Sequence, residues 1–96
     1  MSPVPTIARV CGRLGGMSRW HVYIVRCSDK SLYTGIAKDV AARVAQHNAG
    51  TGAKYTRGRL PVELVYYEYV GEHGAALRRE LAIKRMPASD KRRLAD

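Results

Sequence analysis

Residues 20–48 read WHVYIVRCSDKSLYTGIAKDVAARVAQHN, and this stretch decides the fold. It holds two runs that are rich in β-branched and aromatic residues, separated by the turn-like Ser28-Asp29-Lys30. Such runs favour β-strands, and a short polar segment between them favours a hairpin. In the segment that follows, apolar residues recur at the spacing of an α-helix. The stretch therefore predicts a strand, a turn, a second strand and a helix.

The pairing of the two strands decides which side chains share a face. If Cys27 lies opposite Ser31 across a three-residue loop, Tyr23 lies opposite Gly35. Tyr23 and Tyr33 then project from the same side, whereas a slip of one residue would separate them. Because Gly35 has no side chain, we expect an open place beside Tyr23 where a ligand or another backbone could approach closely.

The helix after the hairpin is expected to begin with Asp39 as its N-cap and to end near Asn48, with Gly50 in the left-handed position beyond it. On the helical wheel Arg43 and His47 lie one turn apart, at one margin of the buried stripe. Purely structural roles remain open for both. Arg43 could pair with Asp39, and His47 could be an ordinary residue of the last turn, where the helix dipole favours it. The buried stripe consists of Val40, Ala41, Val44 and Ala45.

Residues 49–60, AGTGAKYTRGRL, combine three glycines with basic and aromatic side chains and no acid. We expect a mobile basic loop that contacts the phosphate backbone of a nucleic acid, with its tyrosine stacked on a base or sugar. The alternative is a plain connection whose tyrosine packs back onto the sheet. The candidate contact residues are Lys54, Tyr55, Arg57 and Arg59.

The rest of the chain predicts a third strand over 62–70 and a second helix over about 73–86, which Pro87 stops. Both faces of the strand are apolar or aromatic, which is typical of a strand covered by helices on two sides. A short basic helix over 91–94 follows, with Ser89 as its cap. The predicted fold is α+β: a three-stranded, largely antiparallel sheet packed with helices in the order β-β-α-β-α, and then the short helix.

Glu80 is the most informative residue of the second helix, because its place on the wheel is the middle of the inward face. A carboxylate turned towards a core is costly unless it is paired or binds a metal. Glu80 could form an i,i+4 pair with Lys84, or reach past the margin of the core to a cation on the tyrosine face. The inward face itself consists of Ala76, Leu77, Leu81 and Ile83.

The chain of 96 residues is long enough for one domain with a single modest core. Its 17 Lys and Arg against 8 Asp and Glu give a net charge of +9, which favours nucleic acid over a membrane as the partner. No apolar run approaches the roughly 20 residues that span a bilayer. The two cysteines, Cys11 and Cys27, form no zinc or disulfide framework, so a reducing cytoplasm is the expected compartment.

Residues 1–18 contain several Pro and Gly without sustained periodicity. We expect them to form a flexible leader before a domain over 19–96. The leader has no apolar segment of the kind that a secretory signal needs. It is either a genuine arm or the result of a start placed upstream of the true one at Met17.

An ordered set of five positions carries a resemblance to a known family: Val22-Tyr23-Ile24, Tyr33-Thr34-Gly35, Arg43, His47 and Glu80. Together they resemble the GIY-YIG nuclease superfamily, over about residues 20 to 94. Within that superfamily the chain looks like the small stand-alone bacterial proteins that consist of the nuclease domain alone. Its stretch AKYTRGRLPVELVYYE is similar to theirs.

The resemblance implies a metal-dependent nuclease. It implies that Glu80 holds one divalent ion, Mg2+ or Mn2+, and that Arg43 steadies the scissile phosphate. It places Tyr23 and Tyr33 beside the attacking water, one of them as general base, with His47 as the other candidate for the proton. A free phenol has a pKa of about 10 and is a poor base at about pH 7, so we expect nearby positive charge to lower the pKa of the working tyrosine.

The chain departs from the family pattern at Val22, where the first motif has glycine, and at Thr34, where the second has isoleucine. No asparagine follows Glu80, although some larger members have one in the site. The chain also has no added DNA-binding domain, and so small a domain has too little surface to read bases in a groove. We therefore expect weak affinity for DNA or RNA and a preference for structure or single strands over sequence. We expect a monomer that acts in DNA repair or nucleic-acid processing. The alternatives are a catalytically silent nucleic-acid-binding module of the same fold and a small RNA-associated protein.

Overall fold

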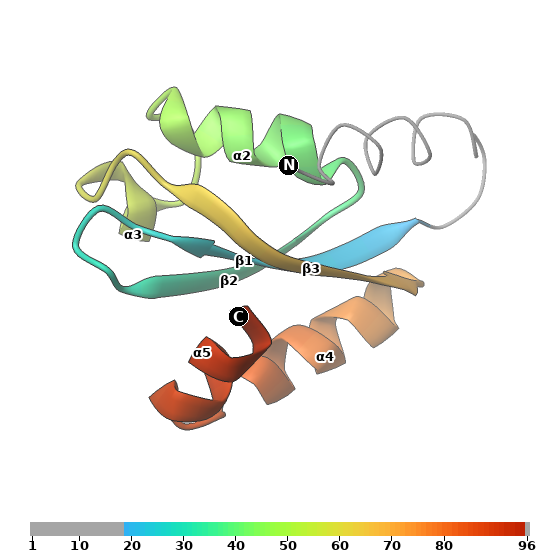
Figure 1. Cartoon of the computed structure of the whole chain (residues 1–96). Coiled ribbons are helices and arrows are strands. Elements are labelled where there is room, and N and C mark those ends of the chain that lie inside the picture. Colours follow the sequence, from blue (N-terminus) through green and yellow to red (C-terminus); the bar gives the residue numbers. More distant parts are fainter. Residues whose placement is uncertain (1–18, 96) are drawn as a thin grey trace.

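The computed structural model describes residues 19–95. The expected leader over 1–18 lies outside the described residues, and so do the start considered at Met17 and the terminal Asp96. Within the described part, a central sheet separates two helical layers (Figure 1). No helix in this part is long and apolar enough to cross a membrane.

The predicted hairpin forms the start of the sheet. Its antiparallel strands are β1 (Trp20–Arg26) and β2 (Leu32–Ala37). The register is the expected one, because the Cys27 N–H donates to the Ser31 carbonyl at 2.8 Å and Tyr23 pairs with Gly35. Tyr33 packs against the core cluster that contains Tyr23, so the two tyrosines share a face of the sheet.

The third strand, β3 (Glu63–Gly71), pairs antiparallel with the other edge of β1 and gives the strand order β2-β1-β3. The prediction of a three-stranded antiparallel sheet packed with helices is confirmed. As the central strand, β1 is buried throughout residues 21–25. A side chain on β1 is therefore held by neighbours on every side.

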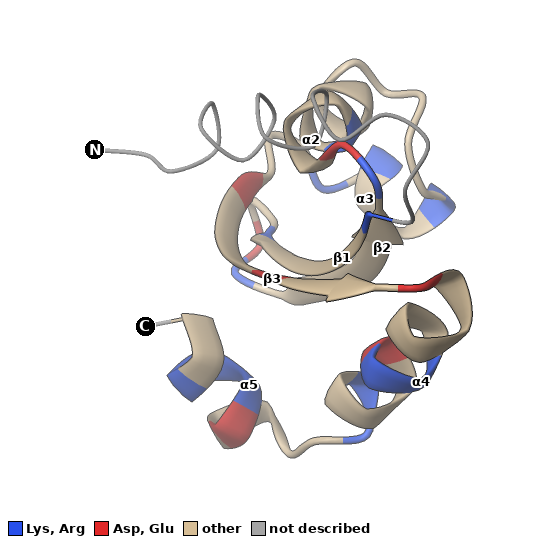
Figure 2. Ribbon diagram, turned by 90° about the vertical axis from the view of Figure 1, so that its right-hand side faces the viewer, with Lys and Arg blue, Asp and Glu red and all other residues tan. Residues whose placement is uncertain are grey.

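Helices cover both faces of the sheet (Figures 1 and 2). One face carries α2 (Val40–Asn48) and α3 (Lys54–Arg57), and the other carries α4 (His73–Lys84) and α5 (Ala88–Ala95). Tyr23 and Val25 belong to the core on the α2 side. Ile24 packs with Ala76 and Ile83 on the α4 side. Alternate residues of β1 thus pack into two separate cores, because successive side chains of a strand point to opposite faces of the sheet.

The helix α2 has its predicted ends, but its buried face differs from the prediction. Val40 and His47 are buried, whereas Ala45, which was expected in the buried stripe, is exposed, so the helix is rotated towards His47. The Asp39 side chain caps it by accepting from the Ala42 N–H at 3.0 Å. At the other end Asn48 donates to the Val62 carbonyl at 3.0 Å and accepts from the Val62 N–H at 2.7 Å. Beyond it Gly50 has a φ of 84°, the left-handed conformation expected there. These contacts hold the last turn of α2 against the sheet.

The loop expected over 49–60 contains the one-turn helix α3 and is more regular than its three glycines suggest. The Thr56 N–H and hydroxyl both donate to the Ala53 carbonyl, at 3.1 and 2.9 Å. The Arg59 N–H donates to the Thr56 carbonyl at 3.0 Å. Local hydrogen bonds therefore hold the turn from Ala53 to Arg59.

The terminal helix begins earlier than expected. The Pro87 carbonyl accepts from the N–H groups of Asp90 and Lys91 at 3.0 and 3.1 Å. The helix consequently starts at Ala88, and the prediction of Ser89 as its N-cap is wrong, because Ser89 lies within the first turn. Proline ends one helix but is well tolerated at the start of the next, so α4 and α5 follow one another closely.

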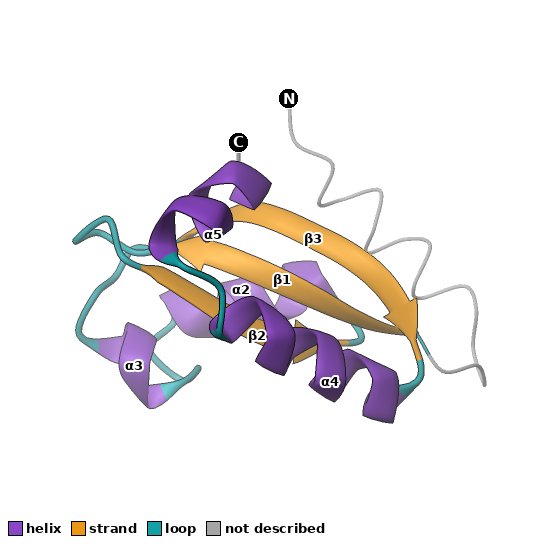
Figure 3. Cartoon of the chain, turned by 90° about the horizontal axis from the view of Figure 1, so that it is seen from below, coloured by secondary structure: helices purple, strands orange, loops and turns teal. Residues whose placement is uncertain are grey.

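The helix α4 packs against β1 and β2 (Figure 3), and its inward face differs from the prediction. Leu77 and Leu81 are 44% and 48% exposed, whereas Ala76 and Ile83 are fully buried. The predicted face has Glu80 at its centre, but the helix is rotated so that Glu80 lies at the margin of the core. This orientation avoids the cost of burying an unpaired charge.

This rotation is testable with two truncations. Ile83→Ala should lower the free energy of unfolding by about 2–5 kcal/mol, because it empties a fully buried site. Leu81→Ala removes a half-exposed side chain from the same helix and should cost less than about 1 kcal/mol. Urea unfolding followed by circular dichroism measures both values. Equal losses would show that Leu81 packs as deeply as Ile83.

Candidate active site

A hydrogen bond between the central strand and α2 lies at the centre of the candidate site. Tyr23 Oη on β1 and His47 Nε2 in the last turn of α2 are 2.8 Å apart. Tyr23 is 1% exposed and His47 is 0% exposed, so bulk water does not compete for this bond. The imidazole nitrogen thus lies within hydrogen-bond distance of the phenol hydroxyl, which is the geometry that proton transfer needs.

Two glycines make room for the pair. A Cβ on Gly35 would lie 2.6 Å from Tyr23 Oη, and a Cβ on Gly52 would overlap His47 Nδ1. The place expected to be open beside Tyr23 is therefore filled by Tyr23 itself, whose hydroxyl end crosses over Gly35. Gly52 in turn lets the segment before α3 come up against the imidazole.

His47 is held on its other side by α3. Its Nδ1 lies 2.8 Å from Thr56 Oγ1 and 3.4 Å from the Ala53 nitrogen. The Tyr33 ring meets the imidazole edge-on, with centroids 5.4 Å apart. The two tyrosines of the hairpin and the threonine of α3 therefore surround one histidine.

Burial sets the charge state of the Tyr23–His47 pair. It raises the pKa of Tyr23 to about 12, and the nearby Arg43 guanidinium opposes this shift only in part. Burial also lowers the pKa of His47 below its usual 6.5, and the charge of Arg43 adds to that shift. Both groups are thus neutral at neutral pH. Arg43 lowers the pKa of Tyr23 in the expected direction, but desolvation outweighs this effect, so the pKa is raised on balance.

Arg43 lies one turn before His47 on α2 and acts on the Tyr23 hydroxyl both as a hydrogen-bond donor and as a positive charge. Its Nη1 also donates to Gln46 Oε1 at 2.9 Å. The carboxylate of Asp39, the structural partner considered for Arg43, accepts from the backbone at the N-cap. The guanidinium is therefore placed on the tyrosine side of α2.

Glu80 approaches the same site from α4. Its side chain is 18% exposed, and its Oε2 lies 3.3 Å from Lys84 Nζ. That ammonium lies 6.0 Å from the centroid of the Tyr33 ring. The charge of Glu80 also contributes to the raised pKa of Tyr23. The i,i+4 pair with Lys84 is therefore confirmed, and the role of Glu80 as the ligand of a cation stays a prediction.

A metal ion at this site would depend on one carboxylate. Among residues 19–95, no group of three or more His, Cys, Asp or Glu side chains could hold a metal ion. Mg2+ commonly keeps several waters and binds through one or two carboxylates together with substrate phosphates. Glu80 fits such a site once the cation displaces Lys84, because a partly exposed ion pair of this kind contributes little stability.

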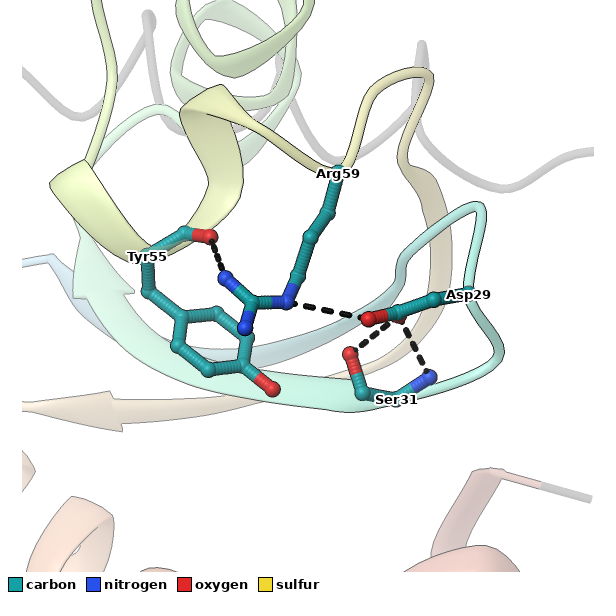
Figure 4. A network of polar contacts seen from close by, with 4 residues as sticks. All are labelled: Asp29, Ser31, Tyr55 and Arg59. Carbon is teal, nitrogen blue, oxygen red and sulfur yellow. Dashed lines mark hydrogen bonds and ion pairs between the residues drawn. The ribbon is translucent and has the colours of Figure 1, made fainter.

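The basic segment over 49–60 contacts the site through Tyr55. Its ring stacks on that of Tyr33, with centroids 5.8 Å apart and an interplanar angle of 21°. The Arg59 guanidinium lies 4.0 Å from the centroid of the Tyr55 ring. It donates to the Tyr55 carbonyl at 2.7 Å and to Asp29 at 3.0 Å (Figure 4). Ser31 donates to the Asp29 carboxylate as well, which holds the pKa of Asp29 below its usual value. Tyr55 thus packs back onto the sheet, and Arg59 is part of the fold.

The structure gathers most of the predicted residues and adds one that sequence reasoning missed. Thr56, which is fully buried behind His47, was not among the candidates. The sequence signal that could have identified Thr56 is its residue type. It is a β-branched hydroxyl residue among the basic residues and glycines of 49–60, and an exposed loop that only contacts phosphates does not require such a residue. The predicted residues gathered around the site are Tyr23, Tyr33, Arg43, His47, Tyr55 and Glu80.

Comparison with known proteins found matches over most of this chain. A family model described as the GIY-YIG catalytic domain matches residues 19–93. A UPF0213 protein of Haloquadratum walsbyi is 56% identical over 81 residues, which cover 83% of this chain and 91% of the relative. A UPF0213 protein of Staphylococcus aureus is 56% identical over 78 residues, which cover 81% of this chain and 95% of the relative.

A solved structure shows the same fold. The solution NMR structure of a UPF0213 protein from Bacillus halodurans has 41% sequence identity to this chain and a TM-score of 0.51. The match covers 79% of this chain and 81% of that protein. The chain therefore resembles other small proteins over most of their length.

The buried histidine predicts a dependence of stability on pH. The pKa of His47 is lower in the folded chain than the usual 6.5, so the unfolded chain binds this proton first as the pH falls. Its contribution to stability is complete above about pH 6.5 and is lost as the pH falls through the folded pKa. We expect the melting temperature to drop between about pH 7 and about pH 5.

His47→Gln should show a shallower dependence than the parent. The dependence should not vanish, because burial also lowers the pKa of His21. Differential scanning calorimetry over this range measures both proteins. If His47→Gln kept the full dependence of the parent, His47 would not be the buried, neutral imidazole described above.

Proposed function

The chain belongs to the GIY-YIG catalytic domain family, a family of nucleases, and we propose that it hydrolyses phosphodiester bonds in DNA with a divalent cation, Mg2+ or Mn2+. The observation that carries this proposal is the buried hydrogen bond of 2.8 Å between Tyr23 Oη and His47 Nε2. Titratable groups with perturbed pKa values, gathered beside a charged partner, are typical of catalytic sites. Here both members of the pair are perturbed, and Arg43 lies beside them.

Hydrolysis needs an acceptor for the proton of the attacking water, and we assign this task to the Tyr23–His47 pair. As the water oxygen bonds to phosphorus, its proton would pass to Tyr23 Oη and the Tyr23 proton to His47 Nε2. Because Tyr23 is only 1% exposed, this step requires that substrate binding open a path for the attacking water to the phenol. The bond from phosphorus to the leaving oxygen breaks, and that oxygen keeps the electron pair. This route avoids a free tyrosinate, which the raised pKa of Tyr23 disfavours.

Positive charge at the phosphate completes the proposed site. Arg43 would donate to the phosphate oxygens on which negative charge develops. Glu80 would hold the cation, which supplies charge to the scissile phosphate and the leaving oxygen. Lys84 pairs with Glu80 and lies beside Tyr33, so it adds a further positive group to this rim.

The proposed substrate is DNA with single-stranded or irregular segments, in repair or in other nucleic-acid processing. Lys and Arg residues occur on helices of both layers (Figure 2), and contacts from such residues to phosphates do not depend on base sequence. Lys54 and Arg57 are exposed on α3. Tyr55 lies between them and is 39% exposed, but its ring contacts Tyr33 and Arg59, so stacking on an unpaired base would require Arg59 to move aside.

A second candidate function is nucleic-acid binding without catalysis. Two observations favour it. Lys84 already pairs with the carboxylate that would hold the cation, and burial raises the pKa of Tyr23 to about 12. Such a module would use the same basic surface but would leave DNA intact.

A cleavage assay separates the two functions. We expect the protein to nick or degrade labelled DNA with Mg2+ or Mn2+, and Glu80→Gln to lower the rate by about 100-fold or more while DNA binding survives. The matched control is Glu63→Gln, which removes an exposed carboxylate that lies 3.7 Å from Arg26 on the sheet and should leave the rate unchanged. Binding of several DNA structures without any cleavage would favour the silent module.

The same variants test the cation itself. With DNA present and millimolar Mg2+, the parent should gain thermal stability that Glu80→Gln does not gain. Without the cation, Glu80→Gln should change the free energy of unfolding by no more than about 1 kcal/mol, because the Glu80–Lys84 pair is partly exposed. An identical metal response in parent and variant would remove Glu80 from the site.

The salt dependence of DNA binding tests the basic surface. Lys54→Gln and Arg57→Gln should each reduce the slope of log K against log salt by about 0.7–0.9, the value for one phosphate contact. Arg59→Gln is the contrasting variant, because Arg59 bonds to Asp29 and should affect stability more than the slope. A double variant of Lys54 and Arg57 with an unchanged slope would show that α3 is not a contact surface.

A further inference from the structure

The hydroxyl of Thr56 lies behind His47, in a part of the molecule that is closed to solvent. Thr56 and His47 are both fully buried, and Oγ1 and Nδ1 are 2.8 Å apart. We propose that Thr56 is a positioning residue that fixes His47 in the tautomer with hydrogen on Nδ1 and leaves Nε2 free to accept the Tyr23 proton. The effect on cleavage rests on the proposed function, whereas the tautomer itself does not.

The carbonyl of Ala53 decides the direction of the hydrogen bonds. Thr56 Oγ1 lies 2.9 Å from it, and a carbonyl oxygen has no hydrogen, so the hydroxyl donates to it. Since a hydroxyl has one hydrogen, Oγ1 can only accept from His47 Nδ1. In a neutral imidazole the other nitrogen, Nε2, is then an acceptor, and the Tyr23 hydroxyl donates to it.

The other tautomer would satisfy fewer groups. With hydrogen on Nε2, the Nδ1 of His47 would accept from Thr56, which would give up its bond to the Ala53 carbonyl. The Ala53 N–H donates to Nδ1 over a long distance of 3.4 Å, and this weak bond exists only when Nδ1 carries no hydrogen, so it is the one contact that counts for the other tautomer. Tyr23 would accept from Nε2, and its own hydrogen would need an acceptor beside Arg43, which offers donors only. A buried hydroxyl without an acceptor is costly, so the tautomer with hydrogen on Nδ1 is favoured.

The backbone around Thr56 fixes the direction of its hydroxyl. Its own N–H also donates to the Ala53 carbonyl, at 3.1 Å, so the first turn of α3 orients the hydroxyl. Gly52 lets the segment approach the imidazole to a distance that any side chain at that position would prevent. The one-turn helix thereby presents a hydroxyl of fixed direction to the histidine, as the partners of metal-bound histidines do elsewhere.

Nitrogen-15 NMR of the imidazoles reads the tautomer without any nuclease assay. The chain has three histidines, and the signals of His47 are those that disappear in His47→Gln. In the parent, Nδ1 should give the shift of a protonated nitrogen and Nε2 that of a bare one. Thr56→Ser keeps the hydroxyl and should keep this pattern. Thr56→Val keeps the shape without the acceptor and should move His47 towards the tautomer with hydrogen on Nε2.

Cleavage rates supply the second readout. Thr56→Val should cleave DNA about 10- to 100-fold more slowly at unchanged DNA affinity, and Thr56→Ser should restore most of the rate. A parent spectrum with hydrogen on Nε2 would overturn the proposal, and so would an unchanged tautomer in Thr56→Val. The parent spectrum decides even if Thr56→Val does not fold. If the parent cleaves no DNA, the proposed function fails, and the spectra still decide the role of Thr56.

Discussion

The hydrogen bond between Tyr23 and His47 is the interaction on which the rest of the structure depends. It joins the central strand to the last turn of α2 over 2.8 Å, out of reach of solvent. It can form only if the hairpin register turns Tyr23 towards α2, if Gly35 lies opposite, and if α2 runs the nine residues that bring His47 over the sheet. Failure of any one of these conditions would leave a buried phenol without an acceptor.

Burial divides the site into a neutral interior and a charged rim. Inside, Tyr23 and His47 hold their protons in one hydrogen-bonded pair, because desolvation raises the pKa of one and lowers the pKa of the other. Around the pair, Arg43 on α2 and Glu80 on α4 carry the charges that act on Tyr23. A substrate phosphate would therefore meet charge first and the proton relay behind it. The rotation of α4 makes this possible, since it keeps the Glu80 carboxylate at the margin of the core.

The net positive charge of the chain overstates the surface that is free to contact a nucleic acid. Arg59 clamps Tyr55 against the sheet, and Arg79 donates to Glu68 at 2.7 Å. Burial would raise the pKa of Glu68, but the hydrogen bonds from Arg79 and Tyr66 hold it below its usual value. These arginines stabilise the fold, so net charge identifies the class of partner better than it identifies the contact residues.

The sequence by itself determined the features that have local causes. The alternation of the two strands and the short polar turn set the register that places Tyr23 and Tyr33 on one face, and Asp39 set the start of α2. The ordered family positions, from Val22 to Glu80, lie within the matched domain. Only the tertiary structure decided what depends on distant segments. It turned Leu81 outward, placed Thr56 behind His47, and raised the pKa of Tyr23, because burial is a property of packing between elements that a local pattern does not contain.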